Sequence, residues 1–219
     1  MDKVTLSFMR FGECEPWIPK KDQEEAEQKI LSKSEKLATC TSEFIKTLLA
    51  IRLQGCAEAE VIWNAACHVN VLSHDLNVFV HVIGTTSSTW TQRAIARAMI
   101  TAMYEGCEDL LELYGKPFKE TCECLGVWSS LESDCRTTLK QLARFRNRHE
   151  RKWRSVRLMA GAHKDHDALA MLQEVANVSA GETVSQAREL DDILRALGAF
   201  SMKAIDVTED VLRKRGVLA

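Results

Sequence analysis

The chain has 219 residues, a formal net charge of −2 and an apolar content of 46%, which is ordinary for a globular domain and excludes a disordered or collagen-like chain. It holds only 3 prolines and 10 glycines, too few for the turns of a large β-sandwich or β-barrel. No apolar run of roughly 18 residues predicts a membrane span, and the N-terminus lacks the layout of a signal peptide. We therefore expect a cytoplasmic protein whose 8 cysteines stay reduced.

Helical periodicity runs through most of the chain, with apolar residues recurring at steps of three and four. It predicts a single all-α domain over residues 21–219, preceded by an irregular arm over residues 1–20 that holds Pro16 and Pro19. Clustered β-branched residues make a strand the local alternative at residues 78–83. The predicted helices cover residues 22–55, 61–83, 89–114, 117–125, 129–160, 165–177 and 183–215.

The lengths of these segments favour an antiparallel bundle of about four to five long helices plus short helices. Capping-box patterns support two of the predicted starts, at residues 89–92 and at residues 129–132. The first long helix carries an apolar face, and such a face is normally buried against a neighbouring helix. The face consists of Ile30, Leu37, Phe44, Ile45, Leu48 and Leu49.

Positive charge is concentrated in one predicted helix. Between residues 136 and 157, Glu150 is the only acid among nine cations. Five of them follow one another at steps of four or three and so share one helical stripe, in which like charges repel. Two explanations stay open: pairing with acidic runs on other helices, near Glu25, Glu108 and Asp191, or contact with the phosphates of RNA or a nucleotide. The nine cations are Arg136, Lys140, Arg144, Arg146, Arg148, Arg151, Lys152, Arg154 and Arg157.

A candidate catalytic pair follows directly after this basic stretch. Arg157 lies six residues before His163, and the small residues around Gly161 between them would let another backbone come close. Histidine takes or gives a proton near neutral pH, and arginine holds a phosphate and stabilises developing charge. Together they suit acid–base chemistry on a phosphodiester. The alternative for His163 is a helix-terminal residue that hydrogen-bonds a last carbonyl.

The sequence resembles the HEPN superfamily at these motifs. Members of that superfamily carry an arginine followed four to six residues later by a histidine on a long bundle helix. Arg157 and His163 fit this spacing, and so do Arg144 and His149. The preceding helix, with Trp90, Arg93, Tyr104 and Glu105, is similar to the family's preceding helix.

The resemblance implies a helical bundle that dimerises and acts on RNA or a nucleotide, as a metal-independent endoribonuclease of a bacterial defence or toxin–antitoxin system. His163 would be the acid–base group and Arg157 would hold the scissile phosphate, with no cofactor and no metal. In family dimers the two sites face each other, which would place Gly161 near the partner helix. The residues expected to support substrate binding are Arg144, Asn147, Arg148, His149, Arg151 and Arg154.

Two other classes of function stay open. The first is a non-catalytic helical dimer that acts as a protein-interaction module, in which Arg157 and His163 would each be dispensable. The second is a metal-dependent phosphohydrolase of the HD superfamily, with His68, His74-Asp75 and a later aspartate as ligands. A zinc site is not expected, because the C-x-C spacing of residues 122–124 is not the usual one and no histidine lies nearby.

Overall fold

The computed structural model describes residues 18–56, 59–158, 173 and 175–218, and every regular element in this part of the chain is a helix. The all-α bundle is confirmed, with five long helices and one short one. The alternative of a strand at residues 78–83 is wrong, because α2 continues through them. The helices are α1 (Lys20–Leu53), α2 (Glu60–Thr85), α3 (Thr89–Leu113), α4 (Lys116–Leu125), α5 (Trp128–Val156) and α7 (Ala180–Lys214).

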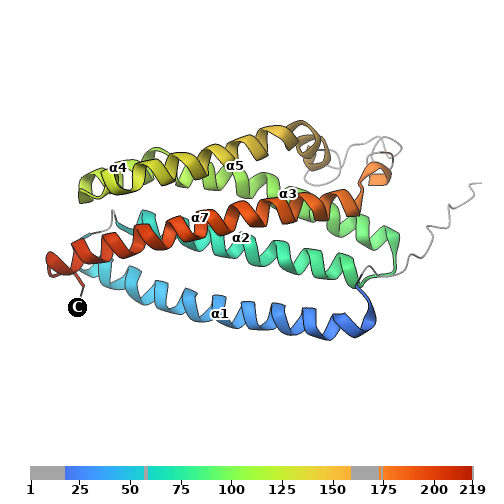
Figure 1. Cartoon of the computed structure of the whole chain (residues 1–219), viewed down its shortest axis with the longest axis horizontal. Helices are drawn as coiled ribbons and strands as arrows, with labels where there is room; N and C mark the ends of the chain where they lie inside the picture. Colours follow the sequence, from blue (N-terminus) through green and yellow to red (C-terminus); the bar gives the residue numbers. More distant parts are fainter. Residues whose placement is uncertain (1–17, 57–58, 159–172, 174, 219) are drawn as a thin grey trace, which may run out of the picture.

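Four long helices form an antiparallel ring in the order α2, α3, α5 and α7, with α7 closing the ring on α2 (Figure 1). Each of the four runs opposite to its neighbours in the ring, as in an up-down-up-down bundle. The fifth long helix, α1, lies along the outer side of α2 (Figure 1), and α4 packs across one end against α2, α3 and α5. None of the described helices is long and apolar enough to span a lipid bilayer.

Local capping chemistry accounts for where several helices begin. The Ser88 hydroxyl accepts a hydrogen bond from the Thr91 amide at 3.2 Å and starts α3 at the predicted place. The Ser179 hydroxyl accepts from the Glu182 amide at 3.3 Å, which starts α7 three residues before the sequence pattern placed it. The turn between α4 and α5 needs Gly126, whose φ of 76° is unfavourable for residues with a side chain.

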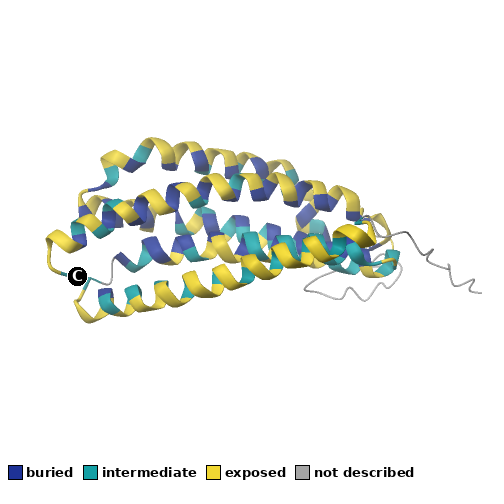
Figure 2. Ribbon diagram, turned by 60° about the horizontal axis from the view of Figure 1, so that its bottom comes forward, coloured by how far each residue is buried: buried dark blue, intermediate teal, exposed yellow. Residues whose placement is uncertain are grey.

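Buried side chains line the inward faces of the ring helices, while the outward faces are exposed (Figure 2). Close packing of α2 on α3 depends on Gly106, because a Cβ atom there would lie 2.5 Å from Leu72 Cδ2. The largest fully buried side chains include Trp63, Trp153, Tyr114, Phe118 and Phe145. Residues 1–17 of the expected arm and most of the expected helix at 165–177 lie outside the described residues.

Candidate nucleic-acid interface

The 29-residue helix α5 has an apolar side that faces the bundle and basic residues on its other sides. Its inward side carries buried apolar residues such as Leu142 and Trp153, packed against the rest of the bundle. Because an α-helix turns once in about 3.6 residues, the cations between these positions divide into two flanks and one outward face. One flank lies beside α3 and the other beside α7, and the outward face lies between the two flanks.

The flank beside α3 is neutralised by carboxylates of that helix. Arg146 binds Glu108 through its Nε atom, and Arg157 Nε donates to Glu105 Oε1 at 3.0 Å. The Arg157 guanidinium also lies over the Tyr104 ring, 5.5 Å from its centroid. These acids belong to one of the runs that the sequence offered as structural partners. Arg157 is therefore directed toward its own bundle.

The flank beside α7 is neutralised in the same way. Arg148 Nη1 lies 2.7 Å from Glu189 Oε1, and Lys152 Nζ lies 2.6 Å from Glu182 Oε2. Both pairs are half exposed, so each contributes about 1 kcal/mol or less to stability. Their effect is to fix the position of α5 on α7. Arg136 makes a further pair within α5 itself, with Glu132 one turn earlier.

The outward face of α5 keeps four cations without a carboxylate partner in the described part of the chain. They are exposed and lie at steps of four, seven and three residues, which keeps them on one side of the helix. Asn147 lies among them, and its Oδ1 accepts a hydrogen bond from Arg146 Nη1 at 3.0 Å. We call this set the outer basic face; it consists of Lys140, Arg144, Arg151 and Arg154.

Two shallow cavities border the outer basic face on the side of α7. One of about 420 Å³ has Arg144, Arg148 and Glu189 in its lining. The other, of about 380 Å³, has Arg148, Arg151 and Asn177 in its lining. Arg148 lines both cavities; the far side of the first is formed by α7, with Glu189 and Asp192, and that of the second by Asn177 and Val178 before α7.

His149, which was expected to support substrate binding, does not lie on the outer basic face. Its ring stacks on Trp153, with centroids 5.1 Å apart and planes 19° apart, and touches Phe145 at 4.9 Å. Its Nε2 atom is buried without a hydrogen-bond partner among the described residues. Burial is the main cause that lowers the pKa of His149 below its ordinary value of about 6.5. The ring is thus held neutral at the edge of the core.

This burial predicts a pH dependence of stability. Because the pKa of His149 is lower in the folded than in the unfolded chain, the unfolded chain binds more protons as the pH falls through about 6.5. The free energy of unfolding should therefore fall between about pH 7.5 and about pH 5.5. The His149→Phe variant should lose less stability over this range than the wild type does. Urea unfolding at both pH values measures the difference, and equal losses would contradict it.

Of the expected catalytic pair only Arg157 lies in the described part of the chain, so the pairing itself stays a prediction. Arg157 is held by Glu105, and His163 and Gly161 lie outside the described residues. The metal-ligand set of the HD alternative is not assembled, since no group of three His, Cys, Asp or Glu side chains with the geometry of a metal site occurs in the described ranges. His74 instead has its Nε2 atom 2.6 Å from the Ser34 hydroxyl on α1.

Of the cysteines at and near the C-x-C motif, Cys107, Cys122 and Cys135 are buried thiols, whereas Cys124 is exposed. Burial is the main cause that raises the pKa of Cys107 and of Cys122 to about 12, and that of Cys135 to about 11. At neutral pH these residues are protonated, and a protonated thiol is a poor nucleophile and a poor metal ligand. They act as small apolar residues of the core.

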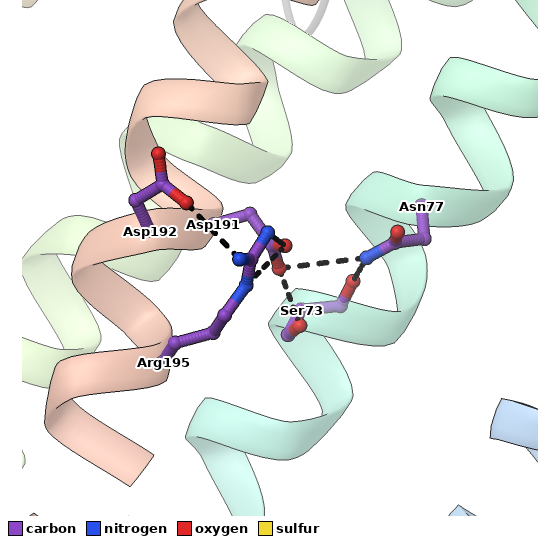
Figure 3. A network of polar contacts seen from close by, with 5 residues as sticks. All are labelled: Ser73, Asn77, Asp191, Asp192 and Arg195. Carbon is purple, nitrogen blue, oxygen red and sulfur yellow. Dashed lines mark hydrogen bonds and ion pairs between the residues drawn. The ribbon is translucent and has the colours of Figure 1, made fainter. Parts of the chain in front are cut away.

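A polar network that the sequence did not indicate joins α2 to α7 (Figure 3). The Asp191 carboxylate accepts from the Ser73 hydroxyl at 2.6 Å, from Asn77 Nδ2 at 3.4 Å and from Arg195 Nη2 at 2.9 Å. Asp191 is 7% exposed, whereas its neighbour Asp192 is exposed and, among the described residues, pairs with Arg195 alone. The available signal in the sequence was the position of Asp191 between Leu190 and Leu194, which are both buried.

The structure therefore gathers some of the expected binding residues and separates others. Arg144, Asn147, Arg151 and Arg154 lie on one exposed side of α5, Arg148 lies at its edge, and His149 is turned into the bundle. Comparison of the chain with known proteins gives no match to any family model, to any curated protein or to any solved structure.

Proposed function

We propose that this protein binds RNA along the outer basic face of α5. The observation that carries the proposal is the division of the α5 cations: those on both flanks are paired with carboxylates, and those on the outward face are not. Cations whose role is only to hold the bundle together are expected on the flanks, where they can reach carboxylates of α3 and α7. The four outward cations repel one another without any gain to the described fold, and a row of phosphates would neutralise them.

The dimensions of the face suit a nucleic-acid strand. Lys140 and Arg154 are 14 residues apart on one continuous helix, which is about 21 Å at a rise of about 1.5 Å per residue. The cations between them stay on the same side of the helix. The cavities beside this face have Arg144, Arg148 and Arg151 on their α5 side, and one of them has Glu189 and Asp192 of α7 on the opposite side.

The contacts would go to the backbone of the RNA and not to its bases. Phe145 and Trp153, the aromatic residues within the basic stretch, are 1% and 0% exposed and so are not open to stacking. Arginine and lysine contacts to phosphates position a strand without reading its sequence. Binding of this kind is weakly sequence-dependent and falls steeply with salt concentration.

Binding has more support than cleavage from the described residues. Arg157, the expected phosphate-holding residue of the catalytic pair, already has Glu105 and Tyr104 as partners. The outer basic face needs no such rearrangement before it meets a ligand. A protein-interaction module is the competing function, and an acidic protein would be its ligand.

The test compares two variants with the same change in net charge. Arg144→Ala/Arg151→Ala should weaken binding of a fluorescent single-stranded RNA of about 20 nucleotides by roughly tenfold, and should lower the slope of log affinity against log salt by about 1.4, since each phosphate contact to a single strand contributes about 0.7. The control, Lys214→Ala/Arg215→Ala, removes two exposed cations from the end of α7. It should leave both values close to those of the wild type.

Fluorescence anisotropy at several salt concentrations measures both quantities. Equal losses in the two variants would mean that only net charge matters, and the proposed interface would be rejected. Absence of RNA binding by the wild type at low salt would reject the function itself.

A further inference from the structure

The helix α1 is poorly covered for its length. Only Ile51 is buried among its 34 residues, and the helix packs along α2 at the edge of the bundle (Figures 1 and 2). Five of the seven large apolar side chains that are exposed in the described part of the chain lie on α1 and α2. They are Leu31, Ile45, Leu49, Leu53 and Val71, between 45% and 86% exposed. Concentration of such residues on one side of a molecule is typical of an interaction surface.

The two flanks of α1 differ in character. The side that meets α2 includes Phe44 and Leu48, which pack against the core. Next to it, the flank with Lys33 and Lys36 is polar and lines a small groove with α2. The opposite flank carries most of the exposed apolar residues of α1, and we call it the apolar flank of α1. It consists of Leu31, Ala38, Ile45, Leu49 and Leu53, at steps of seven, seven, four and four residues, with Glu35 and Ser42 between them on the same side.

We propose that the apolar flank of α1 binds the same flank of a second copy of this chain, with the two α1 helices antiparallel and a two-fold axis beside Ala38. Leu31 and Ile45 lie seven residues to either side of Ala38. An antiparallel pair centred there places Leu31 of each copy against Ile45 of the other, and brings Leu49 and Leu53 level with Glu27 and Gln23. A two-fold interface requires this self-complementarity, and the small Ala38 lets the helices approach closely at the axis.

Charges at the borders of the flank favour the same arrangement. Glu24 and Arg52 each lie 14 residues from Ala38, so the pairing brings Glu24 of one copy level with Arg52 of the other. Glu24 has no ion pair among the described residues, and Arg52 is 64% exposed although it binds Glu60. A parallel pairing would place like charges together and lose this complementarity.

This interface is separate from the outer basic face. In Figure 1 the helices α1 and α5 lie on opposite sides of the bundle, with α2, α3 and α7 between them. Dimerisation through α1 therefore leaves both outer basic faces open to solvent. It also differs from the arrangement implied by the HEPN resemblance, in which the two sites face each other.

The test is the mass of the full chain in solution. Light scattering at tens of micromolar should give twice the 24.7 kDa of one chain, and Ile45→Lys should halve that mass because it places a charge opposite Leu31. Ser32→Lys, a matched substitution on the exposed side of α1 away from the apolar flank, should remain a dimer. Ile45 is 52% exposed, so its replacement leaves the fold intact, which circular dichroism checks.

A separate experiment tests whether the two-fold axis lies beside Ala38. Oxidation of Ala38→Cys should link two chains covalently through residue 38, whereas Ser32→Cys should give no more linked dimer than the native cysteines do. A monomeric wild type would overturn the proposal and leave the flank to a different partner. A dimer that survives Ile45→Lys and is not linked through residue 38 would overturn it as well, because another surface would hold the copies together. RNA binding is independent of these outcomes.

Discussion

Replacement of Trp153 by alanine is expected to lower the free energy of unfolding by about 3–5 kcal/mol. Trp153 is 0% exposed and lies where α5 meets α7. Its ring stacks on His149 and meets the edge of Phe145, with centroids 5.1 and 5.4 Å apart. Its Nε1 atom donates a hydrogen bond of 2.9 Å to Gln186 Oε1. The alanine variant removes both the packing and this donor and leaves a cavity.

Two further variants separate these contributions. Trp153→Phe keeps most of the volume but leaves Gln186 Oε1 unpaired in a buried position, so it should cost about 1–3 kcal/mol. Arg154→Ala changes the exposed neighbouring residue and should stay within about 0.5 kcal/mol of the wild type. Urea unfolding followed by circular dichroism measures all three. A Trp153→Ala variant as stable as Arg154→Ala would show that the α5–α7 contact does not depend on this side chain.

The second large effect is expected at the carboxylate between α2 and α7. Asp191→Ala removes the acceptor that Ser73, Asn77 and Arg195 share (Figure 3). Leaving these donors without their partner should cost about 2–3 kcal/mol, since unpaired groups at a mostly buried site keep their desolvation penalty. Arg195 is 70% exposed and can return to water, which keeps the cost below that of a fully buried ion pair.

Asp192→Ala is the matched control for this variant. It removes the same charge from the adjacent position, but Asp192 is 71% exposed, and Arg195 is its sole ion-pair partner in the part of the chain that the structure describes. Its expected cost is below about 1 kcal/mol. Equal free energies of unfolding for Asp191→Ala and Asp192→Ala would mean that the network has no net value. The comparison is independent of net charge because both variants lose one carboxylate.

Much of the local structure could be predicted from the chain itself. Apolar steps of three and four residues reflect the helical repeat. The caps themselves were predicted less well: Ser88 and Ser179 cap α3 and α7, whereas α5 begins after Val127 without the side-chain cap expected at residues 129–132. Errors at helix starts were small, because capping residues act within a turn. The strand expected as an alternative at residues 78–83 failed since packing on both sides of α2 overrides local β-propensity.

The candidate interface was predictable only in part. The density of cations between residues 136 and 157 was evident from composition and spacing. The sequence placed Arg136, Lys140, Arg144, Arg148 and Arg151 on one stripe, and in the structure Arg136 and Arg148 of this stripe are paired. The spacing of the cations along α5 does not show whether a given cation lies on a flank or on the outward face. That distinction depends on which helices lie on either side.

By itself the sequence determined the helical class, the approximate helix boundaries and the place where positive charge collects, because these follow from interactions within a few residues. Only the tertiary structure decided which of those charges meet carboxylates. Glu105 and Glu108 approach α5 from α3, and Glu182 and Glu189 approach it from α7, each through contacts that link distant parts of the chain. Packing likewise turned His149 inward and left the apolar flank of α1 exposed, since both outcomes depend on the number and position of neighbouring helices.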